Sequence, residues 1–149
     1  MKIEVREIQA KETYAVRHPV LRPNQGIETC DYPGDHDETT FHLGAFVDNK
    51  LVGIASFYED AFEDFQEEKQ YRLRGMATLP DYRGMQIGAQ LIHAAEALLR
   101  ERSTSIWWCN ARKNAIGFYK KLGLAVYGEE FEIEGIGPHK VMVRKLKST

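Results

Sequence analysis

The residues from Arg72 to Arg100 constrain the fold more than any other part of this 149-residue chain. The stretch QYRLRGMATL (70–79) is rich in strand-forming residues and predicts a strand that ends at Pro80. From residue 84 to 102 the pattern switches to a helical period, with one apolar face made of Ile87, Leu91, Ala94, Ala95, Leu98 and Leu99. A strand that passes through a glycine-containing turn into a long helix predicts an α/β domain.

The turn itself, Arg83-Gly84-Met85-Gln86-Ile87-Gly88-Ala89, has the properties of an anion-binding site. Backbone N–H groups at a helix N-terminus have no intrahelical acceptors, and they bind phosphate oxygens together with the helix dipole. Gly84 and Gly88 let a bulky anion approach the backbone, and Arg83 adds a positive charge. From the glycine spacing alone, a phosphate-bearing ligand and a turn without a ligand are equally plausible. A Walker loop and a dinucleotide fingerprint are excluded, because neither Gly-Lys-Ser/Thr nor GxGxxG occurs here.

The remaining segments complete an alternating pattern of strands and helices. The order β-α-β-β-β-α-β-α-β-β predicts a sandwich, a mixed sheet with helices on both faces. We expect strands at 3–8, 41–47, 51–57, 70–79, 105–109, 124–128 and 139–146, a short helix at 11–22 that Pro19 kinks, and helices at 84–102 and 111–122. Residues 22–40 are expected to form a long loop that is functional or mobile, and Asp48-Asn49-Lys50 is expected to turn a hairpin.

Composition excludes several classes of protein. The chain has 20 Lys+Arg against 22 Asp+Glu and a pI near 6.2, which argues against a general nucleic-acid binder. It has no apolar run long enough for a bilayer and no secretory signal pattern at its start. Two cysteines are too few for a disulfide framework. We therefore expect a single domain over residues 1–149, located in the cytoplasm, without a membrane or nucleic-acid partner.

Two motifs resemble those of the GNAT superfamily of N-acetyltransferases. The turn resembles the family's cofactor-binding motif, Arg/Gln-x-x-Gly-x-Gly/Ala, with Arg83 and Gly88 at matching positions. The family's central glycine is Gln86 here, which retains the backbone N–H but requires its side chain to point away from the phosphates. The stretch AIGFYKKLGL (115–124) resembles the family's A-x-x-x-Y-x-x-x-G-[FL] helix, with Tyr119 as the tyrosine. The order of elements also fits from Ile3 to Leu146.

The resemblance implies a GNAT-type three-layer sandwich with a mixed, mostly antiparallel sheet, and acetyl-CoA held between two splayed strands. It implies that the diphosphate lies on Arg83, Gly84, Met85, Gln86, Ile87, Gly88 and Ala89, and the pantetheine arm along the backbone of Met76, Ala77 and Thr78. The Met76 N–H is the expected donor to the thioester carbonyl, and Tyr119 the expected general acid. The implied reaction is direct attack by an amine of a small molecule or peptide, without a metal. A homodimer is possible.

Several assignments stay open at this point. The general base could be Glu67, Glu68, His42, His139 or a water chain. Arg72 and Arg74 could bind a carboxylate of the substrate or cofactor, or could pair with nearby acids at the surface. The acidic run from Glu59 to Glu68 could attract a cationic amine or be a solvated loop. Other readings are a non-catalytic acyl-CoA-binding regulatory domain and a nucleotide-phosphate binder.

Three other features have ordinary structural explanations. Asp35-His36-Asp37 with Glu38 could suggest a metal site, but a hydrophilic loop commonly carries such residues. Cys109 ends an apolar strand, so we expect a buried packing thiol and not a nucleophile. Trp107 and Trp108 are expected on opposite faces of that strand, one in the core and the other covering a helix or a subunit contact.

Overall fold

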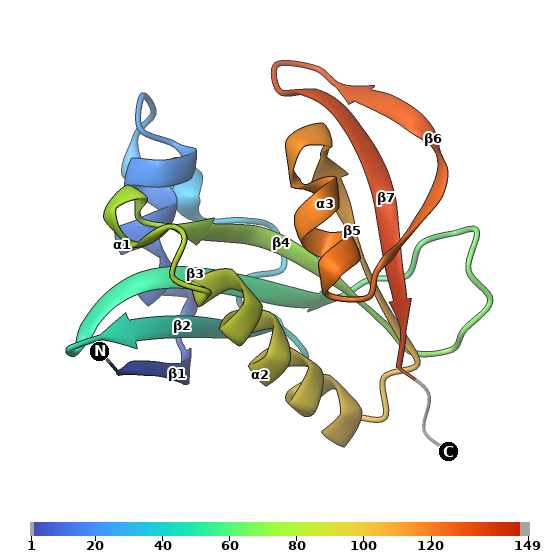
Figure 1. The fold of residues 1–149 in the computed structure, drawn as a ribbon, viewed down its shortest axis with the longest axis horizontal. Helices are drawn as coiled ribbons and strands as arrows, with labels where there is room; N and C mark the ends of the chain where they lie inside the picture. The colour runs from blue at the N-terminus through green and yellow to red at the C-terminus, as the bar shows by residue number, and fades with distance from the viewer. Residues whose placement is uncertain (1, 147–149) are drawn as a thin grey trace.

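Seven strands form one sheet in the computed structural model, which describes residues 2–146 (Figure 1). The strand order is β1-β2-β3-β4-β5-β7-β6, and every neighbouring pair is antiparallel except β4 and β5. The strands are β1 (Ile3–Ile8), β2 (Phe41–Val47), β3 (Lys50–Glu59), β4 (Gln70–Thr78), β5 (Ile106–Arg112), β6 (Ala125–Ile133) and β7 (Gly137–Lys145). The predicted mixed, mostly antiparallel sheet is confirmed.

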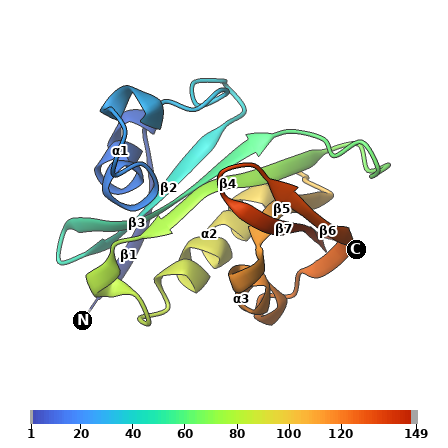
Figure 2. The same ribbon diagram turned by 90° about the horizontal axis from the view of Figure 1, so that it is seen from above.

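Helices cover both faces of the sheet, as predicted. A continuous helical segment of η1 (Ala10–Thr13), α1 (Tyr14–Val16) and η2 (Arg17–Leu21) lies on one face. The long α2 (Ile87–Glu101) and the short α3 (Ile116–Lys121) lie on the other (Figure 2). The first segment changes from 3-10 to α to π geometry, and Pro19 lies in the π turn, where its missing N–H disrupts regular helix bonding.

The main core lies between the sheet and α2. The buried face of α2 contains Ile87, Leu91, Ala95 and Leu99 as predicted, and also Ile92. It packs on the apolar face of the central strands, where Phe41 and Phe57 stack with ring centroids 5.2 Å apart. Trp107 is fully buried in this core, and its Nε1 donates a hydrogen bond to Glu96 Oε2 at 2.8 Å.

The β2–β3 hairpin turns through Asp48 and Asn49 alone, with Lys50 already in β3. Both turn residues have positive φ, 49° and 68°, which is the type I′ geometry that fits the twist of a hairpin. The hairpin prediction is therefore confirmed, with a turn one residue shorter than expected.

The structure differs from the predicted boundaries in three places. β5 extends to Arg112, because Ala111 and Arg112 pair with Lys140 and His139 of β7, so a helix starting at 111 was wrong. α2 begins at Ile87 because Gly84 and Gln86 have left-handed backbones. β6 continues to Ile133 through an irregular register between Tyr127 and Phe131.

Two further expectations need correction. The 22–40 segment is not an open loop: it contains a 3-10 turn, η3 (Ile27–Cys30), and buries Cys30, Tyr32 and Asp35. Within the chain, Trp108 is covered by a loop and not by a helix. Its Nε1 donates to the Asp60 carbonyl oxygen at 2.9 Å and its ring packs edge-on against Phe62, so the 60–69 loop covers it. Between residues 2 and 146, no helix combines the length and apolar character needed to cross a membrane.

Candidate active site

The parallel strands β4 and β5 separate in the middle of the sheet. They pair only over Gln70–Arg72 and Ile106–Trp108, and beyond these residues no pairing joins them. On its other edge, β4 bulges away from β3: Arg74 pairs with Ser56 and Ala77 with Ile54, so Gly75 and Met76 have no partner in register. Gly75 has a φ of +65°, which a glycine adopts without strain. The main chain at Gly75 and Met76 is therefore unpaired on the β5 side, and on the β3 side it lies in the bulge of the ladder.

A cavity of about 560 Å³ occupies this opening. β4 contributes Leu73, Arg74, Gly75 and Met76 to its wall, and β5 contributes Cys109, Asn110, Ala111 and Arg112. The wall is completed from three other parts of the chain: Leu21, Arg22, Gln25 and Tyr32 from the first helical segment and the following loop, Ala115 and Tyr119 beside β5, and Gly135, Ile136 and His139 from β6–β7. Met76 and Tyr119, predicted from the sequence, thus meet in one cavity.

Tyr119 lies on α3 and its hydroxyl points to the β4 bulge. The side chain is buried, and its Oη lies 3.8 Å from Met76 Sδ. Burial, with a smaller contribution from the nearby Cys109 thiol, raises the pKa of Tyr119 above its ordinary value. The phenol therefore keeps its proton at neutral pH, which a general acid requires.

The turn before α2 presents backbone N–H groups. Within residues 2–146, no acceptor bonds to the N–H groups from Gly84 to Ala89, and Gln86 makes no side-chain cap. Gly84 and Gln86 hold positive φ angles of 80° and 66°. The arginine of the motif, Arg83, is exposed and its Nε donates to the Thr78 carbonyl oxygen at 3.3 Å. The turn has the open donors that an anion needs.

Gly88 brings the turn, β4 and α3 close together. A Cβ built at Gly88 would lie 2.8 Å from Met76 Cε and 2.9 Å from Phe118 Cζ. The turn before α2 is therefore next to Met76, although the residues from Arg83 to Ala89 do not line the cavity. Ala77 directs its side chain to Val16 and Ile54 in the core, and Thr78 pairs with Gly53, so neither side chain lines the cavity.

Among the four candidate bases, His139 alone lines the cavity. Its Nδ1 is 2.8 Å from the Gly137 carbonyl oxygen, which can only accept, so Nδ1 carries the proton and Nε2 is the free acceptor of the neutral ring. Glu67 pairs instead with Lys145 at 3.7 Å, and Glu68 is exposed on the 60–69 loop.

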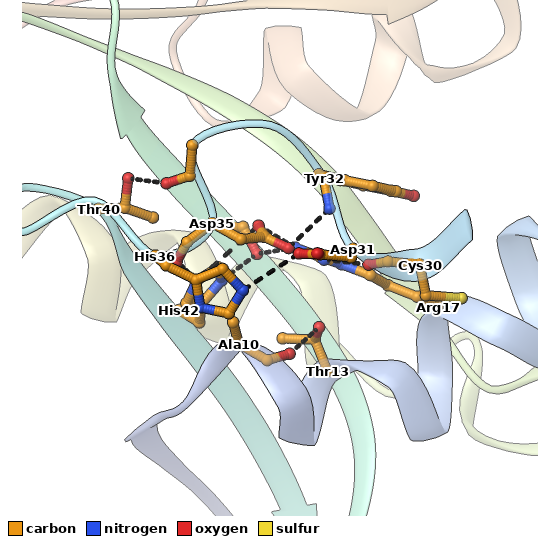
Figure 3. Close-up of polar contacts among 12 residues, drawn as sticks. Ala10, Thr13, Arg17, Cys30, Asp31, Tyr32, Asp35, His36, Thr40 and His42 are labelled. Carbon is orange, nitrogen blue, oxygen red and sulfur yellow. Dashed lines mark hydrogen bonds and ion pairs between the residues drawn. The ribbon is translucent and has the colours of Figure 1, made fainter. Parts of the chain in front are cut away.

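His42 belongs to a buried network on the other side of β3 (Figure 3). Its Nε2 donates to the Asp35 carbonyl oxygen at 3.0 Å, which leaves Nδ1 to accept from Ser56 Oγ at 2.7 Å. Burial lowers the pKa of His42 below its ordinary value, more than hydrogen bonding to Asp35 raises it. With both ring nitrogens occupied away from the cavity, His42 is not suited to act as the base.

Arg17 and Asp35 form the centre of this network, and no pattern in the sequence indicates that they pair. Arg17 is fully buried, and its two terminal nitrogens donate to the Asp35 carboxylate at 2.6 and 3.0 Å. The backbone N–H of Tyr32 also donates to Asp35, at 2.9 Å. The network therefore holds Tyr32, and with it one wall of the cavity, against the sheet. Asp35 is committed to these contacts and not to a metal ion.

Arg72 and Arg74 have different surroundings, although both were considered for carboxylate binding. Arg72 lies over the Trp108 ring and pairs with Asp60 at 3.6 Å. Arg74 lines the cavity and, within residues 2–146, pairs with no acid. Arg72 therefore fits the interpretation as a partner of a nearby acid, whereas the guanidinium of Arg74 is a cation in the cavity wall.

Of the two interpretations of the acidic 59–68 run, the solvated loop fits better, because the run does not line the cavity. Three of its carboxylates have partners elsewhere: Asp60 with Arg72, Asp64 with the Tyr127 hydroxyl at 3.0 Å, and Glu67 with Lys145. Cys109 is buried, and desolvation raises the pKa of its thiol to about 12. It lines the cavity as a neutral packing group, because a nucleophile would need the thiolate.

Comparisons with known proteins agree with this geometry. The acetyltransferase (GNAT) family profile matches residues 3–124. The uncharacterized N-acetyltransferase YitI of Bacillus subtilis is 47% identical over 147 residues, covering 99% of each chain. A putative N-acetyltransferase from Lactobacillus plantarum has a similar fold, with a TM-score of 0.80, 19% identity and coverage of 99% and 100%. An aminoglycoside 6'-N-acetyltransferase complexed with coenzyme A also has a similar fold, with a TM-score of 0.78, 12% identity and coverage of 98% of each chain.

The family match over residues 3–124 and the 47% identity over nearly the whole chain show that the chain belongs to the GNAT family of acetyltransferases. It is an enzyme of the acetyl-CoA-dependent N-acetyltransferase class, and YitI resembles it along nearly the full length of both chains.

Proposed function

We propose that this enzyme transfers the acetyl group of acetyl-CoA to a primary amine by direct attack, without a covalent enzyme intermediate. The observation that carries the proposal is that the Tyr119 hydroxyl and Met76 meet in one cavity, where β5 leaves the edge of β4 open and beside the turn that leads into α2. Cys109 is the only nucleophilic thiol in the wall, and its raised pKa argues against an acetyl-cysteine route.

In this proposal the N–H groups from Gly84 to Ala89 bind the diphosphate of acetyl-CoA. The pantetheine arm then follows the backbone of Met76, Ala77 and Thr78, along the edge of β4 that β5 leaves unpaired. Phe118, which is 36% exposed beside Gly88, offers an apolar surface to the same ligand. Apart from Arg83 and the Tyr119 hydroxyl, the groups proposed to contact the cofactor are backbone or apolar side chains.

The chemistry follows from the groups around the thioester. The amine nitrogen attacks the thioester carbonyl carbon, and the C–S bond breaks as the amide C–N bond forms. The Met76 N–H stabilises the developing oxyanion by about 3 kcal/mol, the value typical of one such donor in acyl transfer. The amine proton goes to His139 Nε2, and the Tyr119 hydroxyl protonates the leaving thiolate. Products are the acetylated amine and free coenzyme A.

Replacing Tyr119 with phenylalanine tests the general acid. Removal of the proton donor should lower kcat roughly 100-fold or more, while the Kd for coenzyme A changes little, because the ring still fills its place. Tyr127→Phe is a matched control, since Tyr127 lies on β6 with its hydroxyl bonded to Asp64, outside the cavity. Unchanged kcat in Tyr119→Phe would remove Tyr119 from the mechanism.

A His139→Gln variant tests the base in the same assay. Glutamine can still bond to the Gly137 carbonyl but cannot take the amine proton, so kcat/KM at neutral pH should fall while coenzyme A binding persists. A His42→Gln variant serves as the comparison for loss of a buried imidazole outside the cavity. The non-catalytic alternative is not favoured, because Tyr119 is retained and lies in the cavity. A non-catalytic acyl-CoA-binding domain would form no acetylated amine in this assay.

A further inference from the structure

The cavity wall carries positive charge and no negative charge. Three arginines line it, Arg22, Arg74 and Arg112, and neither aspartate nor glutamate does. An acceptor amine that attacks the thioester must occupy this space, so its chemistry has to suit a cationic wall. This reasoning rests on the proposed function, because it assumes that the amine enters the cavity described above.

Two of these arginines gather around Tyr32. The guanidinium carbons of Arg22 and Arg74 lie 5.4 and 5.3 Å from the centroid of the Tyr32 ring. The third guanidinium at this ring belongs to Arg17, at 4.0 Å. Three like charges around one buried ring repel one another unless anions offset them, and the repulsion is stronger away from bulk water.

Within residues 2–146, only the buried member of this trio has a carboxylate partner. Arg17 is neutralised by Asp35. Neither Arg22 nor Arg74 pairs with an acid of the described chain, and the Nε of Arg22 is buried without any hydrogen-bond partner. On the same strand, Arg72 forms an ion pair with Asp60. Of these two β4 arginines, only Arg74, which lines the cavity, therefore lacks a carboxylate partner.

The position of these arginines separates them from the proposed diphosphate site. Arg22 and Tyr32 belong to the segment that covers the α1 face of the sheet, whereas the 83–89 turn leads into α2 on the opposite face (Figure 2). A diphosphate on that turn would therefore leave Arg22 and Arg74 free for the second substrate.

We propose that the acceptor is a primary amine that also carries an anionic group, bound by Arg74 and Arg22. A guanidinium presents paired N–H donors that match a carboxylate or phosphate, and such charge-assisted bonds are about twice as strong as neutral ones. A purely cationic amine would meet a repulsive wall. The anion fixes the far end of the acceptor, which orients its amine toward the Met76–Tyr119 end of the cavity.

Matched acceptor pairs test this assignment. Phenylalanine is compared with phenethylamine, and glucosamine 6-phosphate with glucosamine, so the two arms separate a carboxylate from a phosphate. Coenzyme A release is measured with the wild-type enzyme. We expect kcat/KM to be at least 10-fold higher for the anionic member of one pair. In both pairs, an equal or higher kcat/KM for the member without the anionic group contradicts the inference.

Arg74→Gln should then raise the KM for the preferred anionic acceptor roughly 10- to 100-fold and leave the Kd for coenzyme A unchanged. Arg74→Lys keeps the positive charge but loses the planar guanidinium, so its KM should lie between those of the wild-type enzyme and Arg74→Gln. Arg100→Gln is the control, because Arg100 is exposed on α2 and loses the same charge outside the cavity. Each variant is first checked for an unchanged melting temperature.

The outcomes separate the two levels of the proposal. An unchanged acceptor KM in Arg74→Gln, or a weakened coenzyme A affinity in that variant, overturns the anionic-acceptor inference while acetyl transfer stands. Failure of the wild-type enzyme to acetylate any of the four amines counts against the proposed function itself, on which the inference depends.

Discussion

Asp35 is the side chain on which the buried polar contacts of the first helical segment converge. It accepts hydrogen bonds from Arg17, from the Tyr58 hydroxyl and from the Tyr32 backbone (Figure 3). Burial alone would raise the pKa of Asp35, but the hydrogen bonds from Arg17 and Tyr58 outweigh it and hold the pKa below 3.8, the ordinary value. The carboxylate therefore stabilises the fold in its charged form.

Asp35→Asn should lower the free energy of unfolding at pH 7 by about 3–5 kcal/mol, since it leaves Arg17 buried without a counter-charge. The pKa of Asp35 is lower in the folded than in the unfolded protein. The extra stability of the wild type over Asp35→Asn is therefore complete above about pH 4 and declines as the pH falls through the folded-state pKa. Denaturant melts from pH 3 to 7 check this, with Asp37→Asn as the exposed control in the same loop. A difference that is independent of pH would contradict the charge argument.

Gln86 stands where the family motif has glycine, and its backbone explains that preference. Its φ of 66° is left-handed, which is costly for a residue with a Cβ. Gln86→Gly should therefore stabilise the protein by about 1 kcal/mol, or roughly 2–4 °C in melting temperature. Calorimetry measures this directly. A lower melting temperature in the variant would mean that the glutamine side chain makes a stabilising contact.

At the level of elements, α2, β4 and α3 come close together at Gly88, beside the proposed cofactor path. Gly88→Val would drive its side chain into Met76 Cε and Phe118 and over the adjacent N–H donors. We expect the Kd for coenzyme A to rise at least 10-fold.

Gly117→Ala on α3 is the control, because a Cβ there meets nothing within 4 Å. It should leave the Kd unchanged and stabilise by about 0.5–1 kcal/mol. Equal coenzyme A affinity in both variants contradicts the proposed path.

The elements could be predicted from the sequence where one local pattern decides the structure. The apolar spacing of α2 and the Asp48-Asn49 turn are such patterns. The ends of strands that depend on pairing with another strand could not be predicted. Ala111 and Arg112, for example, belong to β5 only because β7 pairs with them. The family resemblance singled out Tyr119 and Met76, and both line the cavity. Arg22 and Tyr32 reach it through the overall fold, which no spacing in the 22–40 segment indicates.

For the whole molecule, the site depends on the splay of two strands with residues from five parts of the chain around it. Coenzyme A that binds this site in the folded state alone should raise the melting temperature. At 100 times Kd the gain is about 2.7 kcal/mol, or roughly 5–10 °C. ATP and NAD at the same concentration should give much smaller shifts. Protection by either nucleotide without protection by coenzyme A would favour the nucleotide-binding reading instead.

A crystal structure of the complex with coenzyme A would place the cofactor relative to the β4–β5 opening. We expect the diphosphate on the N–H groups between Gly84 and Ala89, and the cofactor sulfur in the opening between β4 and β5, near Met76 N and Tyr119 Oη. A cofactor bound elsewhere, with the opening filled by protein side chains, would contradict this expectation.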